Sequence, residues 1–286
     1  MLRHVVRLLG LGFGLVVLCL LYGFFIEPRR LVIRQVSIGE GKQHIKIVLF
    51  SDIHIGGVHV DDARVKSISE TVNDLSPDMV IMAGDYISGH GVRASRSEAF
   101  NQMVLNGFDN LALLSAPMGV YAAQGNHDAW YDKGFVEGEL TRRGITVLEN
   151  RTKYILGGLC LVGLADKDTG RTNPRVFDNC VKGARIISVM HSPDSFSILP
   201  PDTILAMAGH THGGQINLPF IGRAVTATRL GKPYAYGLKK WKSTPVFITA
   251  GIGTSKMPAR FRAPPEIVMI DLAYDVDPAL LSLEEN

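Results

Sequence analysis

Five short apolar runs in this sequence each end directly in histidine, aspartate or asparagine, and this pattern constrains the fold most strongly. The junctions read FSDIH from residue 50, AGDY from 83, QGNHD from 124, MHSPD from 190 and AGHTHGGQ from 208. Apolar runs of this length are typical of buried strands in an α/β domain. Because ligands of α/β domains collect at the carboxyl ends of strands, we expect these polar side chains to meet there.

Further strand and helix patterns continue to residue 272. Strands are expected at 45–50, 79–83, 120–124, 145–148, 159–164, 185–190, 203–208, 246–250 and 267–272. Helices are expected at 61–75, 97–114 and 135–143. Because fewer helices separate the later strands, the pattern favours a layered α/β sandwich with its sheets in the middle over a simple doubly wound fold.

The N-terminus carries an apolar run. No charge occurs from Leu8 to Ile26, a stretch of 19 residues. As a helix it would be about 28 Å long, close to the hydrocarbon thickness of a bilayer. No small-x-small cleavage site follows it, which favours an uncleaved transmembrane anchor over a signal peptide. We therefore expect an anchor over 1–30, a connector over 31–44, a catalytic domain over 45–274 and a tail over 275–286.

Charge and cysteine content leave two questions open. The formal net charge is +3, but nine of the positive residues lie between Thr203 and Pro265, a stretch without any acidic residue. This basic stretch is either a solvated surface or a surface that attracts an anionic substrate or membrane. The numbers of arginines before and after the apolar run differ by only one. The sequence therefore does not determine on which side of the membrane the domain lies. Cys19, Cys160 and Cys180 show neither CxxC spacing nor a paired framework, so the redox compartment stays open too.

The polar residues after the apolar runs suit a metal centre. Imidazole, carboxylate and amide oxygen ligands bind divalent ions such as Mn, Fe, Zn or Co. The candidates are Asp52, His54, Asp85, Asn126, His191, His210 and His212. Seven ligands are too many for one tetrahedral site but fit two ions that share a carboxylate. Such a pair clamps the attacking and leaving oxygens of a phosphoryl displacement, so hydrolysis of a phosphoester is the predicted reaction.

The ordered series DIH, GD, GNHD, H and GHTH, from Asp52 to His212, resembles the calcineurin-like metallophosphoesterase superfamily. The resemblance implies a four-layer α/β/β/α sandwich and two divalent metal ions, with manganese as first choice and Fe, Zn, Co or Ni as alternatives. It implies one metal at Asp52, His54 and His212, a second at Asn126, His191 and His210, and Asp85 as the bridge.

The same resemblance implies two catalytic residues. His127 would face the phosphate and either stabilise the transition state or protonate the leaving oxygen, and Asp128 would orient it. A carboxylate beside a histidine fixes the tautomer and raises the basicity of the ring, which is an independent reason to pair these two residues.

Differences from the motifs of three related groups indicate which branch of the superfamily the chain resembles. Its motifs GDYISG and GNHD differ from the GDxVDRG and GNHE of protein serine/threonine phosphatases. Ser88 stands where purple acid phosphatases need a tyrosine, and His127 departs from the GNRD of cytosolic lipid A pyrophosphohydrolases. GHTHGGQI and GIGTSKMPARFRAPPEI look most like bacterial phosphodiesterases that are membrane-anchored or exported, some of which act on UDP-2,3-diacylglucosamine. This resemblance implies a single-pass protein of the bacterial inner or cytoplasmic membrane and a role in lipid A biosynthesis.

An anchor confines enzyme and lipid-linked substrate to one plane and so raises their effective concentration. We therefore expect an amphiphilic phosphodiester or pyrophosphate as substrate and the lipid bilayer as partner. Arg260 and Arg262, or Lys256, are candidates to pair with a second phosphate, although solvated loop charges are an equal alternative.

The same residues are compatible with three other functions. A nuclease would use the basic tract, but the net charge is small and no arginine–aromatic platform is present, so no nucleic-acid partner is expected. A phosphomonoesterase of the same superfamily is a second alternative. An inactive membrane-tethered binding module is a third, although every expected ligand, His127 and Asp128 are present. The sequence leaves the oligomeric state open.

Overall fold

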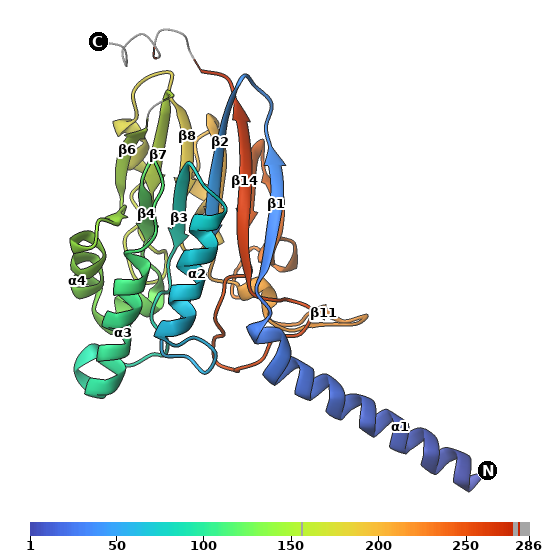
Figure 1. Cartoon of the computed structure of the whole chain (residues 1–286). Coiled ribbons are helices and arrows are strands. Elements are labelled where there is room, and N and C mark those ends of the chain that lie inside the picture. The colour runs from blue at the N-terminus through green and yellow to red at the C-terminus, as the bar shows by residue number, and fades with distance from the viewer. Residues whose placement is uncertain (156, 277–279, 281–286) are drawn as a thin grey trace.

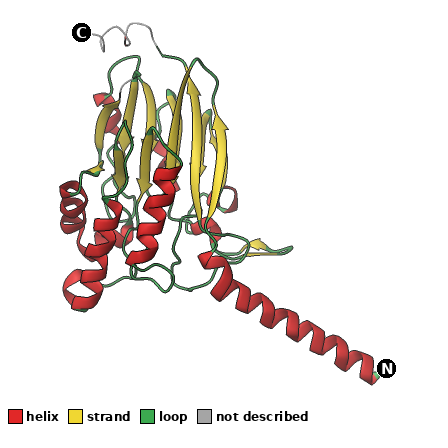
Figure 2. Ribbon diagram, viewed as in Figure 1, coloured by secondary structure: helices red, strands yellow, loops and turns green. Residues whose placement is uncertain are grey.

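Two six-stranded mixed sheets pack face to face in the computed structural model, which describes residues 1–155, 157–276 and 280 (Figures 1 and 2). The first sheet has the order β1 (Val32–Ile38), β14 (Glu266–Tyr274), β2 (Gln43–Phe50), β3 (Met79–Ala83), β4 (Val120–Ala123) and β5 (Thr146–Val147). The second has the order β12 (Gly237–Trp241), β13 (Thr244–Ile248), β9 (Thr203–Ala208), β8 (Arg185–Val189), β7 (Leu159–Gly163) and β6 (Arg151–Ile155). Each predicted strand is present, while β1, β6 and β12 were not predicted.

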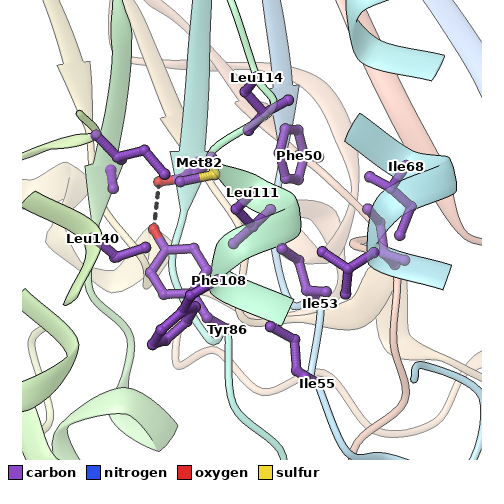
Figure 3. Close-up of a cluster of buried hydrophobic side chains, with 14 of the residues drawn as sticks. Phe50, Ile53, Ile55, Ile68, Met82, Tyr86, Phe108, Leu111, Leu114 and Leu140 are labelled. Atoms are coloured by element: carbon purple, nitrogen blue, oxygen red, sulfur yellow. Dashed lines mark hydrogen bonds between the residues drawn. The ribbon is translucent and has the colours of Figure 1, made fainter. Parts of the chain in front are cut away.

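Three α-helices cover the outer face of the first sheet: α2 (Asp62–Asp74), α3 (Glu98–Leu111) and α4 (Asn126–Arg142). Asp61 caps α2 by accepting the Arg64 N–H, and Ser97 caps α3 by accepting the Phe100 N–H. Their apolar faces pack on the sheet in a core that includes Phe50 and Phe108 (Figure 3).

Helix α4 begins nine residues earlier than predicted. Its first turn is Asn126 to Ala129, and the helix kinks at Asp132, where φ is −176°. The prediction of 135–143 captured only the part after this kink, because the polar first turn lacks helical apolar spacing.

Two more hydrophobic layers complete the sandwich. One lies between the sheets, with Leu49 and Ile187 among its members. The other lies outside the second sheet, under the 3₁₀ helices η4 (Pro174–Asn179) and η5 (Pro193–Ile198). The four-layer α/β architecture is thus confirmed, and in the part of the chain described, 3₁₀ helices take the place of α-helices in the fourth layer.

The predicted connector over 31–44 is wrong, because most of it belongs to the first sheet. Strand β1 pairs in parallel with β14 over seven residues, from Val32–Glu266 to Ile38–Leu272. The sequence pattern missed this edge strand because its partner lies more than 200 residues away. The folded domain therefore starts at β1 and not at residue 45. Most of the predicted tail over 275–286 lies outside the described residues.

The N-terminal helix α1 (Leu2–Leu21) runs without a break into a π-helical turn, η1 (Tyr22–Ile26), and a 3₁₀ turn, η2 (Glu27–Arg29). The helix projects away from the domain (Figure 1), and no residue of Leu2–Leu21 is buried. The segment Leu2–Arg29 is long and apolar enough to cross a membrane.

Cys160 and Cys180 form a disulfide, with their Cα atoms 5.8 Å apart, and Cys19 is free. Cys160 lies in β7 and Cys180 follows η4, so only the packing of η4 on the second sheet brings the two together. Their spacing in the sequence carried no sign of this pairing.

Candidate metal centre

All seven predicted metal ligands lie at the carboxyl ends of strands, at one edge of the two sheets. Asp52 and His54 follow β2, Asp85 follows β3, Asn126 follows β4, His191 follows β8, and His210 and His212 follow β9. Ligand atoms come within 4.8 Å of one another in three groups that share members: Asp52, His54 and His212; His54, Asp85 and His127; Asp85, His191 and His210. The structure thus brings together residues from five strand ends.

The backbone at this edge adopts an uncommon conformation. Five of the seven candidates have a positive φ, from 51° at Asp52 to 70° at His210, in a region rare for residues other than glycine. Such conformations cluster at functional sites, where the surrounding fold holds them. Gly125 is required for a related reason, because a Cβ there would overlap the Asp85 carboxylate.

Backbone carbonyls fix the tautomers of three histidines. The Nδ1 atoms of His54, His127 and His191 lie 3.3, 2.8 and 2.7 Å from carbonyl oxygens. These carbonyls belong to Ile87, Gly89 and Ala83 respectively. Because a carbonyl only accepts, each Nδ1 carries a proton and each Nε2 faces the site. Burial lowers the pKa of His54 and His127, which leaves a lone pair on their Nε2 atoms, whereas the Asp85 carboxylate raises the pKa of His191 against the effect of burial.

The three Nε2 atoms converge on one carboxylate oxygen. The Nε2 atoms of His54, His127 and His191 lie 3.8, 3.9 and 3.1 Å from Oδ2 of Asp85. The Nε2 lone pairs of His54 and His127 and the Asp85 carboxylate repel one another unless positive charge lies between them, which a metal ion or a proton on His191 would supply. Acceptors converging in this way, each oriented by a carbonyl behind it, are typical of metal ligands.

One further buried atom lacks a partner in a way that a metal would satisfy. Asn126 Oδ1 is buried and has no hydrogen-bond partner among the described residues. His54 Nε2 and His212 Nε2 lie 3.1 Å apart, and His212 Nε2 lies 3.4 Å from Asp52 Oδ1. Nitrogen and oxygen donors of this kind fit divalent first-row ions.

Burial controls the protonation of the site. It lowers the pKa of His54 to about 3 and of His210 to about 4, which leaves both rings neutral and able to bind a metal. Burial raises the pKa of Asp52 to about 6 against the opposing effect of His191, and the Asp85 charge adds a smaller contribution in the same direction as burial. Burial alone would also raise the pKa of Asp85, but His191 and the other histidines lower it below its usual value.

Asp128 does not orient His127 as predicted. Its carboxylate accepts the backbone N–H groups of Gly125, Asp85 and Tyr86 at 2.8–2.9 Å, while Gly89 O occupies the Nδ1 position of His127. Asp128 therefore ties the loop after β3 to the start of α4. Its place in the first turn of a helix, where acidic side chains cap backbone donors, is the sequence signal for this role.

Arg260 cannot contact the substrate as predicted, because it is fully buried. Its guanidinium donates to the carbonyls of Ala250, Gly253 and Ala263 at 2.6–3.0 Å. It thereby holds the loop after β13, whose Gly253 N–H donates to the Asp52 carbonyl at 2.6 Å. Arg260 is a positioning residue behind the metal centre.

An open cleft of about 470 Å³ leads to the ligands, and several residues around it were not predicted. Lys256 lines this cleft, whereas the described lining includes neither Arg260 nor Arg262. His90 and Trp130 also line it, each with its ring centroid 4.9 Å from that of His127. His90 is not among the site residues that the sequence predicted.

The comparison with known families agrees with this geometry. The family model described as calcineurin-like phosphoesterase matches residues 45–214, more than half of the chain. The chain belongs to the calcineurin-like phosphoesterase family. It is accordingly a hydrolase of phosphoester bonds, in a family that uses divalent metals.

The chain covers most of the length of three relatives. The chain is 30% identical over 267 residues to an uncharacterised metallophosphoesterase, YkuE, of Bacillus subtilis (strain 168), covering 88% of each chain. It is 28% identical to the UDP-2,3-diacylglucosamine pyrophosphatase LpxG of Chlamydia muridarum, covering 81% of this chain and 84% of that one. It is also 28% identical to the phosphodiesterase YaeI of Escherichia coli, covering 79% and 82%.

Proposed function

We propose that the chain hydrolyses a phosphodiester or pyrophosphate bond at a dinuclear metal site. The observation that carries this proposal is the convergence of three oriented histidine Nε2 atoms on Asp85 at the base of an open cleft. Asp52, His54 and His212 would hold one ion, and Asn126, His191 and His210 the other, with Asp85 between them. When bound, two such ions supply positive charge to the phosphoryl oxygens and lower the pKa of an attacking water.

His127 is the proposed acid–base group. Its Nδ1–H is committed to Gly89 O, so proton exchange with the substrate falls to Nε2. In the neutral ring this atom accepts a proton, and once it is protonated it would donate a hydrogen bond to a phosphate oxygen or its proton to the leaving oxygen. Its ring lines the cleft beside Trp130, where a bound phosphoryl group would lie. The first experiment tests both this role and the reaction.

In that experiment the full chain in detergent with Mn²⁺ is assayed on bis-p-nitrophenyl phosphate and p-nitrophenyl phosphate. We expect faster hydrolysis of the diester. His127→Ala should lower kcat by about 10² to 10³-fold, the loss typical of one transition-state donor, with metal content unchanged. His44→Ala is the matched control, because His44 is exposed and pairs with Asp271 away from the cleft.

Other outcomes assign other functions. A preference for the monoester would indicate a phosphomonoesterase, and stoichiometric metal without turnover would indicate the binding module. A loss of activity in His127→Ala that metal loss fully explains would contradict the acid–base role.

The proposed substrate is amphiphilic, and UDP-2,3-diacylglucosamine is one candidate. The name of the LpxG relative and the apolar helix α1 support this proposal. The cleft supports it too, because Ile216, Ala224, Val225 and Met257 line it together with the polar ligands. We propose accordingly that α1 spans a bacterial inner or cytoplasmic membrane, that manganese is the metal, and that lipid A biosynthesis is the setting.

We further propose that the catalytic domain faces an oxidising compartment, because disulfides persist there and are rare in the cytosol. The full chain is isolated without reductant, denatured and treated with a maleimide–polyethylene glycol. We expect one modified cysteine, Cys19, before reduction and three after it. Cys160→Ser should give two without reduction, and three reactive cysteines in the unreduced chain would contradict the proposal.

A further inference from the structure

A short hairpin beside the cleft has an apolar tip. Strands β10 (Asn217–Leu218) and β11 (Gly222–Arg223) are joined by Pro219, Phe220 and Ile221. Phe220 is fully exposed and Ile221 is 62% exposed. Turn tips are normally polar, so a contiguous apolar tip in water indicates a surface that is covered in the working protein.

The hairpin is continuous with the metal cleft. It follows His210 and His212 along the chain, and Ala224 and Val225, just after β11, form part of the cleft wall. Val225 is itself 76% exposed. Whatever covers the tip therefore also lies at the mouth of the cleft.

The membrane helix enters the domain at this same edge, because of the strand directions. Strand β1 runs parallel to β14, and β14 runs antiparallel to β2. The start of β1 therefore lies at the edge where β2 ends and where the metal ligands Asp52 and His54 follow. Figure 1 shows α1 and the β10–β11 hairpin projecting from this one end of the sandwich.

The junction between α1 and the domain is a packed contact and not a loose tether. The Glu27 carboxylate accepts the backbone N–H groups of Arg262 and Ala263 at 2.9 and 2.6 Å. The Gly23 carbonyl accepts the Arg260 N–H at 2.9 Å. These contacts fix the direction in which the helix leaves the domain.

One residue joins this junction to the hairpin. The ring of Phe261 packs edge-on against Tyr22 at a centroid distance of 6.3 Å. Its backbone forms a bridge with Ile216, and its carbonyl accepts the Asn217 N–H at 2.8 Å. The base of the hairpin and the end of the helix are therefore held by the same loop.

Exposed basic residues surround this base. Arg29 and Arg30 follow the helix, Arg262 lies in the shared loop, and Lys256 lies at the cleft mouth. An apolar tip next to a basic rim is the arrangement that binds the interface of a membrane with anionic headgroups. This charge pattern favours a bilayer over a second protein as the occupant.

We propose that the β10–β11 hairpin is a second membrane contact, whose tip at Phe220 and Ile221 enters the bilayer beside α1. The two contacts hold the mouth of the cleft against the membrane surface, so that an amphiphilic substrate reaches the metal ligands while its acyl part stays in the lipid. Only this last step rests on the proposed phosphodiesterase function.

The test uses the full chain in nanodiscs of anionic lipid, prepared with and without brominated acyl chains that quench tryptophan. Phe220→Trp is compared with the wild type, which supplies the background of Trp130 and Trp241. We expect the added emission to be quenched at least about twofold by the brominated lipid. Val181→Trp is the control, because Val181 is exposed at the opposite edge, before β8 begins. Equal emission of Phe220→Trp in both nanodiscs would overturn the proposal. If an added second copy of the chain then shifts that emission, the tip contacts another chain and not the bilayer, and the proposal is overturned as well.

A second measurement separates the membrane contact from catalysis. The double variant Phe220→Ser, Ile221→Ser should retain its rate on bis-p-nitrophenyl phosphate in solution within about twofold. Its rate on a diacylglycerol p-nitrophenyl phosphate diester in the nanodisc should fall at least tenfold. An equal loss on both substrates, or no loss on either, would overturn the delivery role. Because lipid quenching needs no turnover, its result stands even where no diester is hydrolysed.

Discussion

Asp85→Asn is expected to lower the diesterase rate by about 10³-fold or more while the domain stays folded. The carboxylate lies at the centre of the cluster, within 3.9 Å of three histidine nitrogens. The amide of asparagine has nearly the same shape as the carboxylate. It keeps an oxygen for the backbone N–H of His127, which donates to Asp85 Oδ1 at 2.9 Å. It lacks the negative charge that two cations would share, so metal content should fall with activity.

The measurement combines the rate on bis-p-nitrophenyl phosphate with the metal content of the isolated protein. Asp271→Asn is the matched control, because Asp271 is an exposed carboxylate that pairs with His44 in β2. Near-normal turnover in Asp85→Asn would mean that this residue is not shared between two ions.

Arg260→Met is expected to have the largest effect on stability. The methionine fills much of the same volume but leaves three carbonyls without a donor, each at a typical cost of about 1–3 kcal/mol. We expect a loss of about 3–5 kcal/mol, close to that for breaking a buried charged contact, and a fall in Tm of about 10 °C. Thermal unfolding of the full chain in detergent measures it.

Arg262→Met is the control for this substitution. The Arg262 side chain is exposed, and its backbone N–H donates to Glu27. The substitution should therefore change the stability of the protein by less than about 0.5 kcal/mol. A substrate role for Arg260 would instead appear as a raised KM with an unchanged Tm. That result would contradict the structural role.

The gathering of the seven candidate ligands at one edge could be predicted because its signal is local. Each ligand follows a buried strand within a few residues, as Asp52 and His54 follow Phe50. Parallel strands bring such ends to one edge whatever the intervening chain does. Residue type and position together were therefore enough to predict where the seven side chains meet.

The partners of polar groups could not be predicted in the same way. A basic residue in a loop is usually solvated, yet the loop after β13 folds around Arg260 and buries it completely. Asp128 next to His127 suggested a side-chain pair, but the turn into α4 directs its carboxylate to backbone donors instead. These outcomes depend on how loops distant in the sequence close on one another.

The sequence by itself determined the α/β architecture, the ligand-bearing edge and the apolar N-terminal run, because each depends on residues that are neighbours along the chain. Only the tertiary structure decided that 32–38 is a strand of the sheet, that Cys160 meets Cys180, and that the loop holding Phe261 joins α1 to the hairpin. Each of these is a contact between distant segments. The free energy that stabilises such a contact comes from packing and hydrogen bonds that exist only after the sheets have formed.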